Sequence, residues 1–245
     1  MHVFFLLLAV FFLWAPVVEA GEIVAVDQAN PPFMYDNDGQ AGGIYPALVQ
    51  EAFRRMGEDV QIPTLPWKRA INEANAGACG IAGIYKNGER LKVLEFSDKL
   101  YDEVVIVYVA KGKTFPSDGV RGLYGKAVGV LRGWSYGDEF DAAVKSGKIR
   151  AEEVSGDLQN FQKLVAGRLD AVLVNRESAK IIVSSGGIKD RVDASAAPFL
   201  ASSTYLAFAK SARKTDLIAR FNAALREMHA DGSFDRIVSS IVAAP

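Results

Sequence analysis

Apolar residues along the chain fall into short continuous runs that alternate with amphipathic segments. Runs of this length, rich in Val and Ile, predict buried strands. They lie at 23–27, 60–65, 80–84, 104–110, 127–131, 150–154, 171–174 and 205–209. The amphipathic segments repeat their apolar residues with helical spacing and predict helices. These cover 44–56, 67–75, 137–145, 157–166, 177–184 and 212–228, with a further helix reaching 242. Gly57 ends the first helix, and Asp157 suits the N-cap of another.

The order of these elements, β-α-β-α-β repeated, predicts two small α/β units with largely parallel sheets. Ligands of such sheets bind beyond the carboxyl ends of the strands. Two units that face each other would therefore enclose a cleft lined by the loops that follow the strands. These loops are 28–43, 66–68, 84–90, 132–137 and 175–178.

The first twenty residues have the pattern of an export signal. Residues 3–15 form an uncharged apolar run, VFFLLLAVFFLWA, which is too short as a helix to span a bilayer core of roughly 30 Å. Pro16 breaks the run, and small residues follow at Val18 and Ala20. We expect residues 1–20 to be a cleaved secretory signal. A buried N-terminal helix or an uncleaved anchor is the alternative. No cysteine follows the cut, so a lipoprotein is not expected.

Composition excludes several classes of function. Half of the residues are apolar and 23% are charged, which is typical of a globular protein. The formal net charge of −1 argues against a nucleic-acid partner. Cys79 is the only cysteine, and the histidines are His2 and His229. A disulfide within the chain, a zinc site with several thiolates and paired-histidine sites are therefore not expected, nor is any metal or cofactor. We expect Cys79 to be buried.

Two loops carry candidate binding chemistry. In the first, Phe33 and Tyr35 are aromatic faces for a ligand or parts of an ordinary surface turn. The second, GIYKNGER at 83–90, is no phosphate loop because Glu89 stands where a lysine is needed. Arg90 in this loop has the planar fork that binds carboxylates bidentately. Composition alone favours a surface arginine paired with Glu89 or Asp98 over a carboxylate-binding one.

Longer segments resemble a known family. The stretch GIAGIYKNGERLKVLEFSDKLYDE at 80–103 resembles a motif of the bacterial periplasmic solute-binding proteins for polar amino acids, family 3 of the extracellular solute-binding proteins. LYGKAVGVLRG at 123–133, FQKLVAGRLDAVLVN at 161–175 and REMHADGSFDRIV at 226–238 agree with that family in order and spacing. The resemblance covers nearly the whole chain after residue 20.

The resemblance implies an α/β fold of the type II periplasmic-binding-protein (Venus-flytrap) kind. It has two lobes, each a small doubly wound sheet, and the chain crosses between them twice. We expect lobe 1 to comprise 21–110 plus 203–245, and lobe 2 to comprise 111–202. A ligand held between the lobes would stabilise the closed form through contacts to both.

The resemblance also implies the ligand contacts. Arg90 falls on the position that binds the ligand carboxylate in the family. Gly133, Trp134 and Ser135 stand where the family has a Gly-Thr-Thr cradle. Asn175 stands where an acidic residue usually holds the ligand ammonium. An amide cannot offset that charge, so an α-amino acid would need Glu177 or Asp36. The predicted ligand-binding residues are Arg90, Tyr85, Asn87, Phe33, Tyr35, Trp67, Gly83, Trp134, Ser135 and Asn175.

The resemblance implies a monomeric periplasmic binding protein with no catalysis. We expect it to capture a small carboxylate-bearing, amino-acid-like metabolite with a ring or apolar body, and to deliver it to an inner-membrane ABC permease. A ligand receptor for a membrane sensor is one alternative. A dehydratase-like enzyme acting on a cyclic carboxylate is another, but its general acid would be expected where Asn175 stands.

Overall fold

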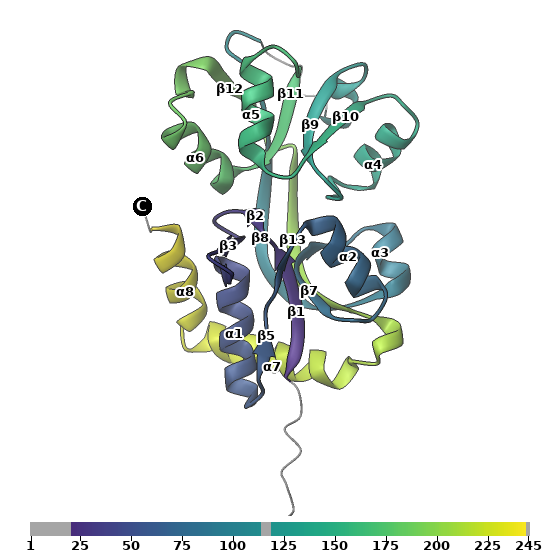
Figure 1. Cartoon of the computed structure of the whole chain (residues 1–245), viewed down its shortest axis with the longest axis vertical. Helices are drawn as coiled ribbons and strands as arrows, with labels where there is room; N and C mark the ends of the chain where they lie inside the picture. Colours follow the sequence, from purple (N-terminus) through teal and green to yellow (C-terminus); the bar gives the residue numbers. More distant parts are fainter. Residues whose placement is uncertain (1–20, 114–118, 244–245) are drawn as a thin grey trace, which may run out of the picture.

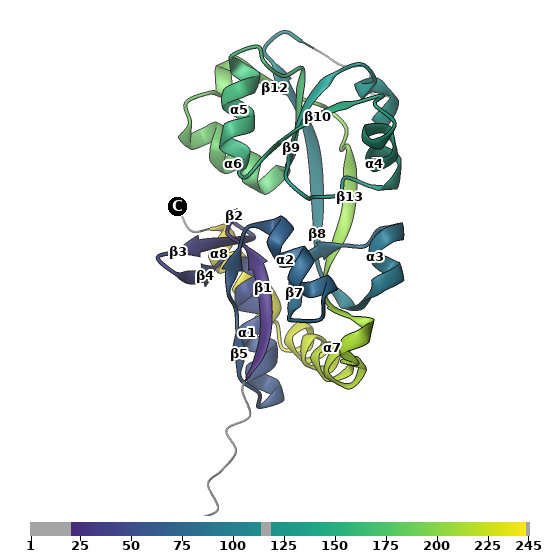
Figure 2. The ribbon, with the colours of Figure 1, turned by 45° about the vertical axis from the view of Figure 1, so that its right-hand side comes forward.

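The computed structural model describes residues 21–113 and 119–243. The predicted export signal at 1–20 lies outside them. The chain forms two lobes, one above the other, and the long strands β8 (Leu94–Ala110) and β13 (Leu200–Ala209) run between them (Figure 1). Figure 2, turned by 45°, shows the same two strands joining the lobes. The predicted two-lobed α/β fold is confirmed.

The lower lobe in Figure 1 contains both ends of the described chain. Its helices α1 (Ile44–Met56) and α2 (Trp67–Asn75) have the predicted limits, because their buried side chains follow the spacing used to predict them. The other elements of this lobe are β1 (Glu22–Asp27), β2 (Ala29–Asn30), β3 (Met34–Asn37), β4 (Gln40–Gly42), β5 (Val60–Gln61), β6 (Thr64–Leu65), β7 (Gly80–Tyr85), α3 (Gly88–Val93), α7 (Thr215–Ala230) and α8 (Ser233–Val242).

The upper lobe is built from the middle of the chain. Its elements are β9 (Ala127–Leu131), α4 (Asp138–Lys145), β10 (Arg150–Val154), α5 (Asp157–Val165), β11 (Ala171–Asn175), α6 (Arg176–Ser185) and β12 (Val192–Ala194). One detail of the sequence analysis is wrong. Asp157 does not cap α5, since Gly156 occupies the N-cap and Asp157 is the first helical residue. The Asp157 carboxylate therefore does not cap the helix.

The sheet is a single hydrogen-bonded path in the order β10-β9-β11-β8-β13-β7-β1-β5. The central strands of each lobe are parallel, as expected: β1 pairs β5 and β7, while β9 pairs β10 and β11. The small sheet of β2, β3 and β4 is antiparallel, and so is the pairing of β12 with β8. The strands that join the lobes are antiparallel to each other and to β7 and β11. Two chain crossings in opposite directions make this unavoidable, and they turn the expected parallel sheets into a mixed one.

Sequence analysis detected only the ends of the two long strands. It predicted 104–110 for β8, which begins at Leu94, and 205–209 for β13, which begins at Leu200. The missed part of β8 is polar at several positions because some of its side chains, among them Asp98, Lys99 and Asp102, are exposed to solvent. The short helix α3 and the small sheet of β2, β3 and β4 were also missed.

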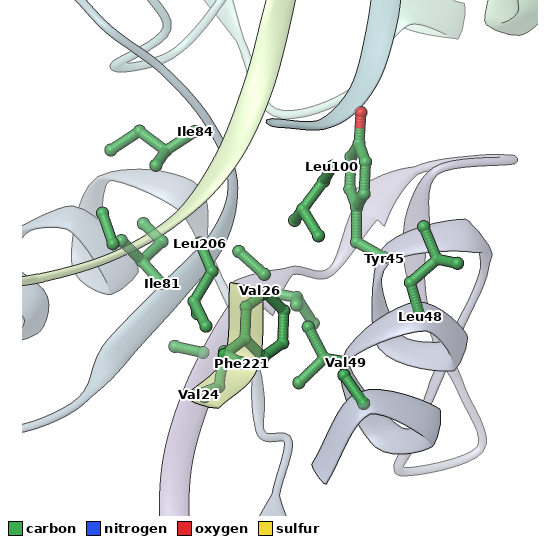
Figure 3. Packing of buried hydrophobic residues seen from close by; sticks show 14 of the residues in the cluster. Val24, Val26, Tyr45, Leu48, Val49, Ile81, Ile84, Leu100, Leu206 and Phe221 are labelled. Carbon is green, nitrogen blue, oxygen red and sulfur yellow. The ribbon is translucent and has the colours of Figure 1, made fainter. Parts of the chain in front are cut away.

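Separate hydrophobic cores support the lobes. In the lower lobe, side chains of β1, β7, α1 and α7 pack together; Val24, Ile81, Leu48 and Phe221 are among those drawn in Figure 3. The upper lobe has two buried clusters, on either side of its strands. Cys79 is buried, as expected. In Figure 3 the Tyr45 hydroxyl points away from the other labelled side chains, so a polar atom leaves the lower core toward the crossing strands.

Gly83 in β7 provides a test of this packing. It has φ +80°, and a Cβ there would lie 2.5 Å from Cδ2 of Tyr45. Gly57, with φ +72°, has nothing within 4 Å. We expect Gly83→Ala to lower the free energy of unfolding by ~3 kcal/mol, from left-handed backbone strain plus overpacking. Gly57→Ala should cost ~1 kcal/mol, from the backbone alone. Urea unfolding measures both, and equal losses would contradict the packing argument.

Candidate functional site between the lobes

The carboxyl ends of strands from both lobes bring polar and aromatic groups together. β1 ends at Asp27, β7 at Tyr85 and β11 at Asn175, while Trp134 lies in the loop after β9. Trp134 packs against the cores of both lobes. Ligands of α/β sheets bind at such strand ends, so this region is the candidate site.

Trp134, from the upper lobe, is held by residues of the lower lobe. Its indole Nε1 donates to Oδ2 of Asp27 at 3.2 Å. Its ring centroid lies 5.3 Å from that of Trp67 and 6.0 Å from that of Tyr85, which it meets edge to face. Three aromatic rings and a carboxylate therefore surround one point between the lobes.

Further contacts hold the lobes together around Trp134. The Gly88 amide donates to Asp138, and the Ser178 hydroxyl donates to the Pro31 carbonyl at 2.7 Å. The remaining space is small. One cavity of about 40 Å³ adjoins Asp27, Trp67 and Trp134, and another of about 10 Å³ adjoins Trp134 and Asn175. Roughly 10–15 Å³ of such space is enough for one water molecule, so these cavities have the size of a few waters. With the Trp134 ring between the lobes, a solute of amino-acid size would require Trp134 to move.

Arg90 is positioned by the start of α3. Asn87 caps this helix, because its Oδ1 accepts the Arg90 backbone N–H at 2.8 Å. The guanidinium donates to the carbonyl of Tyr85 at 2.9 Å and to that of Gly133, across the lobes, at 3.4 Å. It is buried, and burial lowers the pKa of Arg90 to about 10.

The charge of Arg90 has no carboxylate in direct contact within the described part of the chain. Among the described residues no carboxylate forms an ion pair with it, although Asp141 attracts it from further away. A buried guanidinium in contact only with carbonyls has planar donors suited to a carboxylate. Arg90 is therefore the candidate anion-binding group of the site.

Two buried carboxylates complement that cation. Asp27 ends β1, and Asp157 begins α5 in the opposite lobe. Burial raises the pKa of Asp27 to about 6, partly offset by the Trp134 N–H, and raises the pKa of Asp157 to about 7, with repulsion from Asp27 adding to it. Oδ1 of Asp157 has no hydrogen-bond partner among the described residues, and neither carboxylate forms an ion pair with a described cation. Buried unpaired carboxylates are costly and favour a bound cation.

Asn175 faces Glu103, a carboxylate in the middle of β8. The Asn175 Nδ2 donates to Glu103 at 2.6 Å, and the hydroxyls of Tyr45 and Tyr85 also donate to Glu103. The Tyr85 hydroxyl lies 3.3 Å from Oδ1 of Asn175. Asn175 and Tyr85, which the sequence analysis placed at the site, are therefore joined by a buried acid.

The other residues predicted to bind ligand have different surroundings. Phe33 is fully buried in the lower core, where it stacks on Tyr45. Ser135 donates its hydroxyl to Asp141 at 2.5 Å, and Asn87 is a helix cap. Tyr35 lies in β3 against Gly42. Gly83 lies in the core beside Tyr45. For all five, a role in ligand binding stays a prediction.

Asp36 and Glu177 were the suggested replacements for the missing acid at 175. Asp36 is exposed and accepts from the Thr64 hydroxyl and the Gly39 amide. Glu177 follows Asn175 by two residues in α6, and its Oε2 is buried without a hydrogen-bond partner among the described residues. The surface position of Asp36 does not suit a closed binding site, whereas Glu177 retains an uncompensated oxygen.

Sequence reasoning missed Asp27, Asp157 and Glu103. A signal for Asp27 was present, because it is the last residue of a predicted strand, immediately before a loop that was singled out. Asp157 was interpreted as a helix cap, which is the commoner role of an aspartate there. Glu103 had no signal, since its hydrogen-bond partners Tyr45, Tyr85 and Asn175 come from three separate segments of the chain.

Comparison with known families gives the site its context. The model of the bacterial extracellular solute-binding proteins, family 3, matches residues 23–242. The chain belongs to this family. It is therefore a solute-binding protein, and the resemblance found in its motifs is confirmed.

Similar proteins have names that include their ligands. The L-cystine-binding protein TcyJ of Escherichia coli K12 is 24% identical over 88% of this chain and 80% of its own length. An L-arginine-binding protein of Pseudomonas aeruginosa is 27% identical over 87% of this chain and 85% of its own. Holo ArgBP from T. maritima superposes with a TM-score of 0.71 at 26% identity, covering 85% of this chain and 90% of the other.

The family is extracellular by its description. None of the helices in the described part of this solute-binding protein has the length and apolar character needed to cross a membrane.

The unpaired carboxylate of Asp157 makes stability depend on pH. With its pKa raised to about 7 from an ordinary 3.8, the folded protein keeps a proton that the unfolded chain loses between these values. Stability therefore falls as pH rises through that window. We expect Asp157→Asn to stabilise the ligand-free protein by ~1–3 kcal/mol at pH 8, and to make little difference below pH 4.

Urea unfolding across this pH range measures the effect, with Asp190→Asn as control because Asp190 is an exposed carboxylate of the same lobe. A difference between Asp157→Asn and the unmodified protein that is the same at pH 4 and pH 8 would show that Asp157 is not a buried ionisable group.

Proposed function

We propose that this solute-binding protein captures a small amino-acid-like solute that carries both a carboxylate and a cationic group. One observation carries the proposal. A buried guanidinium without a carboxylate partner and two buried carboxylates without a cationic partner lie in the same region between the lobes, among the described residues. A zwitterionic solute would supply both missing charges at once.

The anionic end of the solute is assigned to Arg90. Its guanidinium now donates to two carbonyls, one from each lobe. Two charge-assisted hydrogen bonds to a carboxylate are stronger than bonds to neutral carbonyls. Exchange of these partners would therefore favour the bound state and keep the lobes together.

The cationic end is assigned to Asp27 and Asp157, with Trp67 and Trp134 beside it. The Trp134 N–H now donates to Asp27, and a cationic group of the solute would replace it as a donor to that carboxylate. Indole faces attract cations, so the rings would contribute to binding as well as exclude water. This assignment adds a cation to the ring or apolar body that the sequence suggested.

The named relatives agree with such a solute. Arginine and cystine, which appear in the names of the relatives, combine carboxylate and ammonium groups with a longer side chain. We propose that the signal at 1–20 directs export of the chain to the periplasm. There the protein would bind the solute without chemical change and pass it to an ABC permease.

Closure is proposed to occur about the middle of β8 and β13. Leu100 packs in the lower core and Val105 in the upper one. Ser202, Ser203 and Thr204 lie opposite Glu103, Asp102 and Tyr101. We therefore place both crossings at this level, 101–103 and 202–204. The lobe limits predicted from the sequence, 21–110 plus 203–245 and 111–202, put the first crossing later in the chain than this; those limits stay a prediction.

A ligand screen tests the proposed solute class. L-arginine and L-cystine should raise the unfolding temperature, whereas agmatine, which lacks the carboxylate, and glutarate, which lacks the cation, should not. A solute at 100 times its dissociation constant adds about 2.7 kcal/mol, which corresponds to a rise of roughly 5–10 °C at this size.

Variants then assign the two ends. We expect Arg90→Lys and Asp27→Asn each to weaken binding of the active solute by ~10–200-fold, the range for lost hydrogen bonds to charged groups. Titration calorimetry measures the affinities, with Arg168→Lys, an exposed arginine after α5, as control. Unchanged affinity in either variant would contradict the assignment of that end.

A further inference from the structure

A buried carboxylate lies at the point where the chain crosses between the lobes. Glu103 has no exposed surface. It accepts hydrogen bonds from Tyr45 in α1, Tyr85 in β7 and Asn175 in β11. Thr204 in β13 extends the network, because its hydroxyl donates to the Tyr45 hydroxyl at 3.0 Å. Groups from both lobes and from both crossing strands thus depend on one side chain.

We propose that Glu103 is a positioning residue for the solute. Its carboxylate holds the Asn175 amide and the Tyr85 ring in place; these two side chains are called the cleft wall. It also supplies the negative charge that makes this wall favourable to a cation. The inference rests on the proposed binding of a cationic group between the lobes.

The contacts of Asn175 and Tyr85 show how Glu103 reaches the cleft. Asn175 lines the small cavity that also adjoins Trp134 and Asp157. The Tyr85 ring contacts Trp134 edge to face, and the Tyr85 carbonyl accepts from Arg90. Glu103 itself touches none of the cleft space, so it acts through these two residues.

The same geometry explains why residue 175 is an asparagine. Its Nδ2 lies 2.6 Å from Oε2 of Glu103. An aspartate at 175 would put two carboxylates at that distance, and one of them would have to take up a proton. Only one of the two positions can therefore be negatively charged. In this chain the charge is on Glu103, which lies behind Asn175 as seen from the small cavity. The side chain that lines the cavity is the Asn175 amide.

The surroundings of Glu103 make its charge sensitive to pH. Burial raises the pKa of Glu103 to about 7, against the three donors that lower it. Glu177 in α6 adds repulsion, and the other titratable groups that face Glu103 are phenols: Tyr45, Tyr85, Tyr101 and Tyr136. A protonated Glu103 donates a hydrogen where it now accepts, so one of the tyrosine hydroxyls that donate to it would have to accept instead, and the Asn175 amide would face a neutral acid.

A first experiment needs no ligand. The side-chain amide resonances of Asn175, identified by their absence from Asn175→Asp, are followed by NMR as a function of pH. We expect them to shift with a midpoint near pH 7, because the Nδ2 proton leaves a carboxylate for a neutral acid. Glu103→Gln should abolish this shift. Glu95→Gln, a change of a partly buried glutamate on the same strand, should leave it intact. A shift that persists in Glu103→Gln would overturn the positioning role.

A second experiment measures affinity for L-arginine and L-cystine. Glu103→Gln keeps the side-chain shape and removes the charge, and we expect it to weaken binding about tenfold at pH 8. At pH 5, where Glu103 is protonated, the two proteins should bind equally. Loss of charge from Asp27 and Asp157 at low pH affects both proteins alike, so the ratio of affinities isolates Glu103.

An exchange of the two side chains separates charge from shape. The double variant Glu103→Gln/Asn175→Asp restores one carboxylate and one amide in contact, with the charge now at the wall. We expect it to recover most of the affinity lost in Glu103→Gln. Equal affinities of Glu103→Gln and the unmodified protein at pH 8, or failure of the exchange to recover binding, would overturn the inference.

The two proposals fail differently. If neither solute binds the unmodified protein, the proposed ligand class is wrong for these solutes, while the Asn175 resonances still decide whether Glu103 positions the wall. If Asp27→Asn weakens binding and Glu103→Gln does not, the proposed function stands and the inference about Glu103 falls.

Discussion

The antiparallel pairing of β8 with β13 is the constraint on which the rest of the structure depends. Their ladder runs from Val105 opposite Leu200 to Leu94 opposite Ala209, through the level at which the cores change from one lobe to the other. Two strands joined along this length allow bending but resist separation of the lobes. The strand ends of each lobe therefore meet at one place, and every candidate ligand contact is defined by that meeting.

Charge balance at that place conflicts with stability. Arg90, Asp27 and Asp157 are buried without ion-pair partners among the described residues, and Glu103 is satisfied only by neutral donors. Each group costs folding free energy in the ligand-free protein. Such groups are expected where a site is prepared for a charged solute, because the solute then supplies the missing partners. The Trp134 N–H lowers the free-energy cost of burying Asp27 by donating a hydrogen bond to it.

Prediction from the sequence succeeded where the signal was local. The limits of α1, α2, β9 and β10 match the predicted ranges, since buried side chains repeat along each element with its own period. It failed in the first part of β8, where Leu94 to Glu103 mixes polar and apolar residues because the strand is covered differently along its length. Among the residues that lie between the lobes, Arg90, Tyr85, Trp134 and Asn175 were named from motifs, whereas Glu103, which binds the Asn175 amide, was not.

The sequence by itself determined the class of fold, the family and the presence of an arginine and several aromatic residues in loops after strands, because periodicity and motifs are properties of neighbouring residues. The tertiary structure alone decided which charges lack partners. Asp27 and Asp157 are 130 residues apart in number and come together only when the lobes close. Glu103 meets Tyr45, Tyr85 and Asn175 only at the crossing. Burial and pairing of charges depend on distance in space, which no local pattern of residues encodes.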